Sequence, residues 1–344
     1  MGRDSTKPLL RDDDDWRLQR LQPPAPGSRP RVVIDTDAAN EIDDQFALAW
    51  ALLARDALRI EALYAAPFSF AHRHADTPHL SRELAPFNPP DVGMRRSLAE
   101  IVRVCAACGV SDVPVLAGTA GYLPADGAPT GSGAVNDLIT RALAMPADEP
   151  LYVLALGCPT NVSAALLIEP RIAERIVVVW TSAFPSGARQ PNRSFNFEQD
   201  LRATRHLFDC GVPLVYLPGY HVGAQLRLSW PEVERWVLPC GAIGALLAEL
   251  YTHNPLWPLV GVTDLFAHSW VIWDLICVAW VLRPEWVPSD IVPTPGLDDE
   301  LRWACQPDGL PMREAWGVKR DAIFRDLFER LAQAAGAGIS NVTV

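Results

Sequence analysis

The sequence feature that most constrains the fold is a regular alternation of short apolar runs with stretches of helical spacing. Runs rich in β-branched residues, such as 31–35 and 176–180, predict strands, and the stretches between them predict helices. Alternation of this kind from Arg31 to Gly219 predicts an α/β fold with a mostly parallel sheet and helices on both faces. Beyond about residue 220 the pattern is mainly helical. In such sheets ligands bind at the carboxyl ends of the strands, so we look there for chemistry.

The expected elements follow from this pattern in chain order. Strands are expected at 31–37, 59–68, 113–118, 151–157, 175–181 and 212–219. Helices are expected at 41–56, 97–109, 133–145, 159–170 and 201–211, and in the C-terminal part at 231–238, 241–251, 268–282 and 320–335. No internal repeat or long linker interrupts the series, so residues 30–344 are expected to form a single domain.

The remaining segment and the charge of the chain limit its partners. Residues 1–29 carry an acidic run and several prolines, which is typical of a flexible or loosely docked arm. The formal net charge of −11 argues against nucleic acid or an anionic membrane surface as a partner. Neither an apolar run of membrane-spanning length nor a secretory start is present in the sequence, so a cytoplasmic location is the default expectation.

The seven cysteines are thinly spread and odd in number, which does not indicate a disulfide framework. Cys105 and Cys108 form a C-x-x-C pair, but no second pair or nearby histidine cluster completes four zinc ligands. We therefore expect buried core thiols in an apolar-periodic helix.

Four aspartates lie within ten residues around the end of the first expected strand: Asp35, Asp37, Asp43 and Asp44. Crowded carboxylates repel one another, and a cation relieves that repulsion. Ligands that are all oxygen select a hard ion such as Ca²⁺ or Mg²⁺. The alternative is that Asp43 and Asp44 only favour a helix N-terminus, but this does not account for Asp35 and Asp37. The cluster therefore predicts a metal site.

This segment resembles the opening motif of the inosine-uridine nucleoside hydrolase family, an Asp-x-Asp followed shortly by Asp-Asp and an apolar helix. Three later stretches are similar to family motifs in the same order. They are "ALGCPTNVSAALLIEP", similar to its Gly-Pro-Leu-Thr-Asn loop and helix, "FNFEQDLRATRHLFDCGVPLVYLPG", similar to its Phe-Asn-x-x-x-Asp-x-x-Ala segment, and "WDLICVAWVLRPEW", similar to its late Asp-bearing helix. The resemblance spans roughly residues 31–290 and implies a nucleoside hydrolase-like domain with a Rossmann-like core.

The resemblance also implies a calcium-dependent hydrolase of the N-glycosidic bond of ribonucleosides or related N-ribosides. The implied calcium ligands are Asp37, Asp43, Asp44, the backbone carbonyl of Thr160, and Asp274. Asp35 would not bind the ion itself but would orient the neighbouring ligands and the loop. A metal-bound water would be the nucleophile, with Asp37 as its base, and Asn196 would hydrogen-bond the ribose unless it is only a turn or cap residue. By analogy with the family, a homo-oligomer, either a dimer or a tetramer, is expected.

The sequence departs from the family where the substrate would bind. Five residues separate Asp37 from Asp43, where well-known members have three. Ser194 stands where typical members have Glu, so a charge near the developing cation is lost. Trp273 stands where purine-cleaving members have His, and tryptophan cannot supply a proton near neutral pH. The loop after the second expected strand also lacks the family's Asn.

Because of these departures, the sequence does not determine which residues contact the aglycone. Trp273 and Trp270, three residues apart on one expected helix, could stack on a base or sugar, or could both be core residues. His221 and His268 are candidates for the acid that protonates the leaving group. Two alternatives to a nucleoside hydrolase therefore remain: a hydrolase of another glycoside in the same cleft, and a sugar- or nucleoside-binding protein with little turnover.

Overall fold

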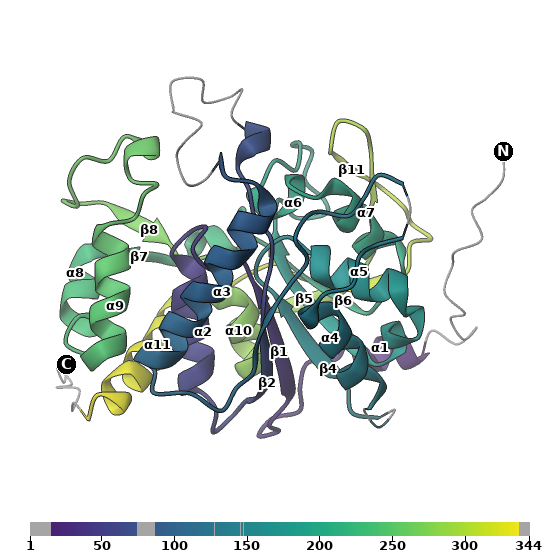
Figure 1. Ribbon diagram of the computed structural model, residues 1–344. Coiled ribbons are helices and arrows are strands. Elements are labelled where there is room, and N and C mark those ends of the chain that lie inside the picture. Colours follow the sequence, from purple (N-terminus) through teal and green to yellow (C-terminus); the bar gives the residue numbers. More distant parts are fainter. Residues whose placement is uncertain (1–14, 74–86, 127, 145, 147, 337–344) are drawn as a thin grey trace.

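An eight-stranded sheet forms the centre of the molecule, as the computed structural model shows for residues 15–73, 87–126, 128–144, 146 and 148–336 (Figure 1). The strand order is β3-β2-β1-β4-β5-β6-β12-β9. The strands are β1 (Arg31–Thr36), β2 (Arg59–Ala65), β3 (Val115–Ala117), β4 (Leu151–Ala155), β5 (Ile176–Ser182), β6 (Leu214–Pro218), β9 (Ser289–Pro293) and β12 (Pro311–Ala315). Every neighbouring pair is parallel except β12 with β9, so the predicted mostly parallel sheet is confirmed.

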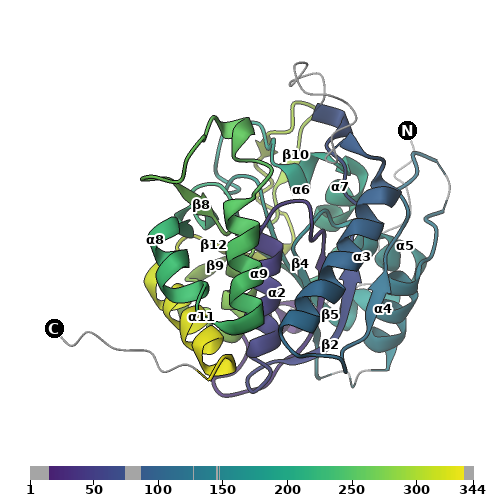
Figure 2. The ribbon, with the colours of Figure 1, turned by 60° about the vertical axis from the view of Figure 1, so that its left-hand side comes forward.

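Helices cover both faces of the sheet, as Figures 1 and 2 show. One face carries α2 (Asp43–Leu53), α3 (Pro90–Ala107), α9 (Gly241–Thr252), α10 (Leu275–Leu282) and α11 (Arg320–Ala334). The other carries α4 (Gly133–Leu143), α5 (Thr160–Ile168) and α7 (Leu201–Asp209). The short elements are α1 (Asp15–Arg20), α6 (Phe195–Glu198), α8 (Trp230–Glu232) and the strand pairs β7 (Arg227–Ser229) with β8 (Ser269–Val271) and β10 (Gly296–Leu297) with β11 (Trp303–Ala304).

The apolar run of β1 is explained by burial on both sides of the sheet. Val32 and Ile34 pack into the core layer under α2 and α10, whereas Val33 packs into the layer under α4 and α5. Successive side chains of a strand point to opposite faces, so a strand covered on both faces must be apolar throughout. This double burial fixes the carboxyl end of β1, where Asp35 and Asp37 follow.

The C-terminal part differs from the expected pattern at two points. It contributes β12 and β9 to the central sheet. Neither strand was predicted, because Arg313 and Glu314 interrupt the apolar pattern of β12 and Asp290 interrupts that of β9. The single helix expected at 268–282 is wrong at its start: residues 269–271 form β8, and α10 begins only at Leu275. Trp270 and Trp273 therefore do not share a helical face.

The predicted arm at 1–29 is described only from residue 15 onward. There, α1 leads into Leu21, whose side chain is fully buried in the core. The Arg313 guanidinium donates a hydrogen bond to the Leu21 carbonyl, so this part of the arm is docked on the domain. Across the described residues, no helix is both long and apolar enough to cross a bilayer. All seven cysteines are free thiols, including Cys105 and Cys108 of the C-x-x-C pair.

Candidate functional site

A cavity of about 140 Å³ opens at the carboxyl ends of β1, β4, β5 and β6. Parallel strands bring their carboxyl ends to one edge of the sheet, so loops far apart in sequence meet there. The loop after β1 contributes Asp37 to the wall of the cavity, and the start of α10 contributes Trp273 and Asp274. This is the edge at which the sequence predicted a ligand site.

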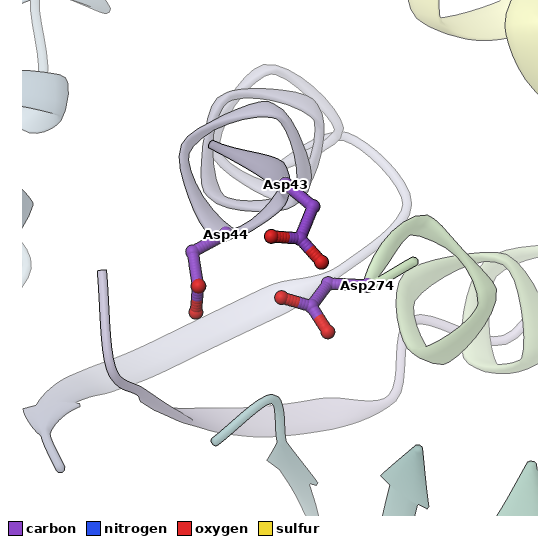
Figure 3. Close-up of side chains that lie close together, drawn as sticks. All are labelled: Asp43, Asp44 and Asp274. Carbon is purple, nitrogen blue, oxygen red and sulfur yellow. The ribbon is translucent and has the colours of Figure 1, made fainter. Parts of the chain in front are cut away.

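Three buried carboxylates from two helices meet at this cavity (Figure 3). Asp43 and Asp44 open α2, and Asp274 directly precedes α10. One carboxylate oxygen from each lies within 4.8 Å of the others, and all three side chains are buried. Asp43 Oδ1 and Asp274 Oδ1 have no hydrogen-bond partner among the described residues. Buried carboxylate oxygens that point at one another without donors are suited to a hard cation.

Asp37 follows β1 and is held tightly in place. Its carboxylate accepts a hydrogen bond of 2.9 Å from Asn40 Nδ2, and its backbone carbonyl accepts one from the Asn40 amide. On its other side lies Gly157 after β4, where an added Cβ would be 2.8 Å from Asp37 Oδ1. Only glycine fits at such a close approach. Asp37 therefore has one well-defined position at the wall of the cavity.

Residues behind the cavity orient these carboxylates. Thr36 donates its hydroxyl proton to Asp44, and Asn161 Nδ2 donates to Asp35 Oδ1 at 2.7 Å. Asp35 is buried but does not line the cavity. This position agrees with the predicted supporting role, which no direct observation tests.

Burial and mutual repulsion raise the pKa values of the whole cluster. Desolvation is the largest cause in each case, and it raises the pKa of Asp35 and of Asp44 to about 7. The pKa values of Asp37, Asp43 and Asp274 are also raised well above the ordinary value, with charge repulsion inside the cluster adding to burial. Such a cluster holds its full negative charge at neutral pH only with a compensating cation. The donor set and its unpartnered oxygens therefore fit the predicted calcium ion.

The predicted carbonyl ligand, Thr160, lies outside the lining of the cavity. Thr160 opens α5 and is fully buried, and its hydroxyl donates to Asp200 Oδ2 at 2.7 Å. Thr160 is not among the described residues that line the cavity. Its backbone carbonyl as a calcium ligand therefore stays a prediction.

The two predicted sugar contacts, Ser194 and Asn196, do line the cavity. Ser194 Oγ lies 2.7 Å from Ser182 Oγ and accepts a hydrogen bond from the Ala183 amide, so protein groups already use much of its capacity. Asn196 Nδ2 donates to the Leu156 carbonyl, which leaves its amide oxygen for a ligand.

The predicted aglycone residues divide between two neighbouring cavities. Trp273 lines both the first cavity and a second one of about 330 Å³, and Trp270 and His268 line only the second. Trp257 packs edge-on against Trp270, with ring centroids 4.8 Å apart. His221 lies beside Phe184 and is not among the described residues that line either cavity. The assignment of His221 or His268 as the leaving-group acid stays a prediction.

The sequence reasoning missed several residues at the cavity. Asn40 and Glu41 come from the long loop after Asp37, and Phe70, Arg73 and Tyr220 form part of the wall. The unusual loop length was a signal for the first two. No motif pointed to Arg73, which forms an ion pair with Glu198.

Comparison with known proteins finds a matching family model and curated relatives. A family model described as inosine-uridine preferring nucleoside hydrolase matches residues 89–302, which begin after the loop of Asp37. The pyrimidine-specific ribonucleoside hydrolase RihA of Salmonella paratyphi A is 26% identical over 162 residues, 45% of this chain and 49% of that protein. The chain thus spans about half the length of the curated relatives it matches.

Two solved structures show the same fold over nearly the whole chain. The purine-preferring ribonucleoside hydrolase from Gardnerella vaginalis aligns with a TM-score of 0.66 and 17% identity, covering 89% of this chain and 99% of that one. The type III effector protein XopQ, complexed with adenosine diphosphate ribose, aligns with a TM-score of 0.65 and 16% identity, covering 95% and 99%. The predicted nucleoside hydrolase-like fold is therefore confirmed.

Proposed function

Because the chain belongs to the inosine-uridine preferring nucleoside hydrolase family, we propose that it is a calcium-dependent hydrolase of the N-glycosidic bond of ribonucleosides or related N-ribosides. The observation that carries the proposal is the meeting of Asp43, Asp44 and Asp274 within 4.8 Å, in a cavity that Asp37 and Asn196 also line. This combination supplies a cation site and a base within reach of one small ligand.

Each residue of the cavity has a separate role in the proposed reaction. The Asp37 carboxylate accepts a proton from the attacking water, whose oxygen forms the new bond to the anomeric carbon. The bond from that carbon to the base nitrogen breaks, and its electron pair leaves with the base. The carboxylates around the cavity stabilise the positive charge that develops on the sugar. Asn196 hydrogen-bonds the sugar through its free amide oxygen.

Calcium, held by Asp37, Asp43, Asp44 and Asp274, would supply charge to activate the water and to bind sugar hydroxyls. Thr160 would add its carbonyl as in the family pattern, and Asp35 would orient the ligands through Asn161.

A second candidate is hydrolysis of a glycoside with a larger aglycone. The observation that favours it is the second cavity, which is lined by Trp257, Trp270 and Trp273 and shares Trp273 with the first. Aromatic walls stack on planar rings and on sugar faces alike. The same chemistry at Asp37 would serve either substrate.

The testing experiment is a hydrolysis assay with calcium and then with chelator, on purine and pyrimidine nucleosides, adenosine diphosphate ribose and p-nitrophenyl riboside. The artificial riboside has a good leaving group and needs no acid from the protein. Calcium-dependent cleavage of that compound supports the proposal, and the preferred nucleoside then identifies the base. Failure on the whole panel with calcium bound would contradict it and favour another glycoside or a binding role.

A further inference from the structure

The side-chain amide of Asn40 has a hydrogen-bond partner at its nitrogen but none among the described residues at its oxygen. Asn40 is only 7% exposed and lines the first cavity. Its Nδ2 donates to Asp37 Oδ2 at 2.9 Å, which fixes the orientation of the amide. Its Oδ1 has no hydrogen-bond partner among the described residues. A buried acceptor left without a donor is unfavourable, so the ligand of this cavity is expected to bring one.

The neighbouring residue adds a second acceptor to the same wall. Glu41 lines the first cavity, and its carboxylate faces the Trp270 indole and the Arg73 guanidinium. Asn40 and Glu41 both belong to the five-residue loop between Asp37 and Asp43, which is two residues longer than in well-known members of the family. The additional length of the loop therefore brings two acceptors to the cavity.

The other polar groups of the cavity show which ligand chemistry is missing. Ser194 already bonds to Ser182 and to the Ala183 amide, and the Asn196 amide nitrogen bonds to Leu156. Among the described residues that line the cavity, the unpartnered atoms are acceptors: Asn40 Oδ1, Asp43 Oδ1 and Asp274 Oδ1. Calcium would satisfy the two aspartate oxygens, so the organic ligand of the cavity must bring a donor to Asn40 Oδ1. A polyhydroxylated sugar does so, whereas an ester or an ether does not.

We propose that Asn40 Oδ1 and the Glu41 carboxylate accept hydrogen bonds from sugar hydroxyls, so that the long loop forms a sugar-recognition subsite. The inference rests on the proposed function, because it places the sugar of the substrate beside Asp43, Asp44 and Asp274. It assigns Asn40 two roles: its nitrogen positions Asp37, and its oxygen binds one hydroxyl directly.

The test measures binding of the product sugar, which does not require turnover. Titration calorimetry on the full chain saturated with calcium gives dissociation constants for D-ribose and its 2-, 3- and 5-deoxy forms. Asn40→Ala is expected to weaken ribose binding about tenfold, as is usual for one lost hydrogen bond to a neutral group in a buried site. One deoxy sugar should bind the wild type about tenfold more weakly, and Asn40→Ala should show no further loss with that sugar.

Matched variants separate this role from general damage. Asn136→Ala on the exposed face of α4 and Glu300→Ala, at an exposed position outside both cavities, should bind ribose as the wild type does. Glu41→Ala should weaken ribose binding without Asn40 being changed, which keeps the proposal testable if Asn40→Ala does not fold.

Four results would overturn the inference. The first three are unchanged ribose binding in both loop variants, equal penalties for every deoxy sugar in the Asn40 variant, and no ribose binding by the calcium-loaded wild type. The fourth is a loss confined to calcium affinity, which would make Asn40 a metal ligand. Failure of the proposed function looks different, because ribose would bind with the expected pattern while no N-riboside is cleaved.

Discussion

The main chain at Gly157 lies directly against the carboxylate of Asp37, because β4 and β1 are neighbouring parallel strands that end at the same edge of the sheet. A Cβ at residue 157 would lie 2.8 Å from both Asp37 Cγ and Asp37 Oδ1. Real Cβ atoms do not approach so closely, so any side chain at 157 must displace the aspartate. Asp37 is proposed as both calcium ligand and base, so the proposed chemistry depends on a glycine that follows a neighbouring strand.

We therefore predict that Gly157→Ala lowers activity far more than stability. Overpacking of this kind costs about 1–3 kcal/mol in the free energy of unfolding. A displacement of about 1 Å in a reacting group can cost about 100-fold in rate. The measurements are denaturant unfolding and the turnover rate on p-nitrophenyl riboside. Gly187→Ala is the matched control, since an added Cβ there meets nothing within 4 Å. Full activity in the Gly157 variant would mean that Asp37 does not need this position.

Replacing Asp37 itself tests the proposed base. Asp37→Ala should reduce turnover by about 10²–10⁴-fold or more, because it removes general-base catalysis together with a calcium ligand. The fold should be largely retained, since a buried carboxylate with a raised pKa is not a major stabilising group. Circular dichroism checks the fold, and Asp299→Ala, at a fully exposed position, is the control. Retained activity in the Asp37 variant would disprove the mechanism.

Asp274 provides a separate test of the metal site, because it comes from a different part of the chain. Asp274→Ala should weaken calcium binding by more than about 100-fold, the upper range for losing a supporting group around a metal. Titration with calcium followed by metal analysis of the dialysed protein measures this directly, again beside Asp299→Ala. Unchanged calcium content in the Asp274 variant would remove this residue from the ligand set.

The sequence predicted the parts of the fold that repeat a simple pattern. The strands β1, β2, β4 and β6 lie within the expected ranges, and β5 extends one residue beyond its range, because each is an apolar run buried on both faces. β12 and β9 were missed because charged residues stand inside both strands, Arg313 and Glu314 in β12 and Asp290 in β9, and because β12 pairs with a distant part of the chain. Long-range pairing of this kind leaves no local periodicity to detect.

At the site, too, residues with a local sequence signal were predicted, and residues that depend on long-range contacts were not. Asp43, Asp44 and Asp274 were found because their spacing and motif context are local, and the structure brings them together. Trp270 was assigned to a helix because the run at 268–282 is continuously apolar, whereas β7 pairs with its first residues and makes them a strand. The contributions of Arg73 and Tyr220 depend on loops meeting above the sheet, which no single segment encodes.

The last prediction concerns the stability of the metal-free protein as a function of pH. Burial raises the pKa of Asp35, Glu41 and Asp44 to about 7 in the folded state, whereas carboxyl groups in an unfolded chain titrate near about 4. The folded state therefore binds more protons than the unfolded state between these values. A raised carboxyl pKa contributes stability that is fully present below about pH 4 and is lost as the pH rises through about 7.

The melting temperature in chelator should accordingly fall between pH 5 and pH 8. Calcium binds the ionised carboxylates and compensates their repulsion, so saturating calcium should raise the melting temperature more at pH 8 than at pH 5. Differential scanning calorimetry at several pH values, with chelator and with calcium, measures both trends. Asp274→Asn reduces the charge repulsion in the cluster. In chelator, the melting temperature of this variant should therefore fall less steeply with pH than that of the wild type. A calcium effect of equal size at both pH values would show that these carboxylates do not hold the ion.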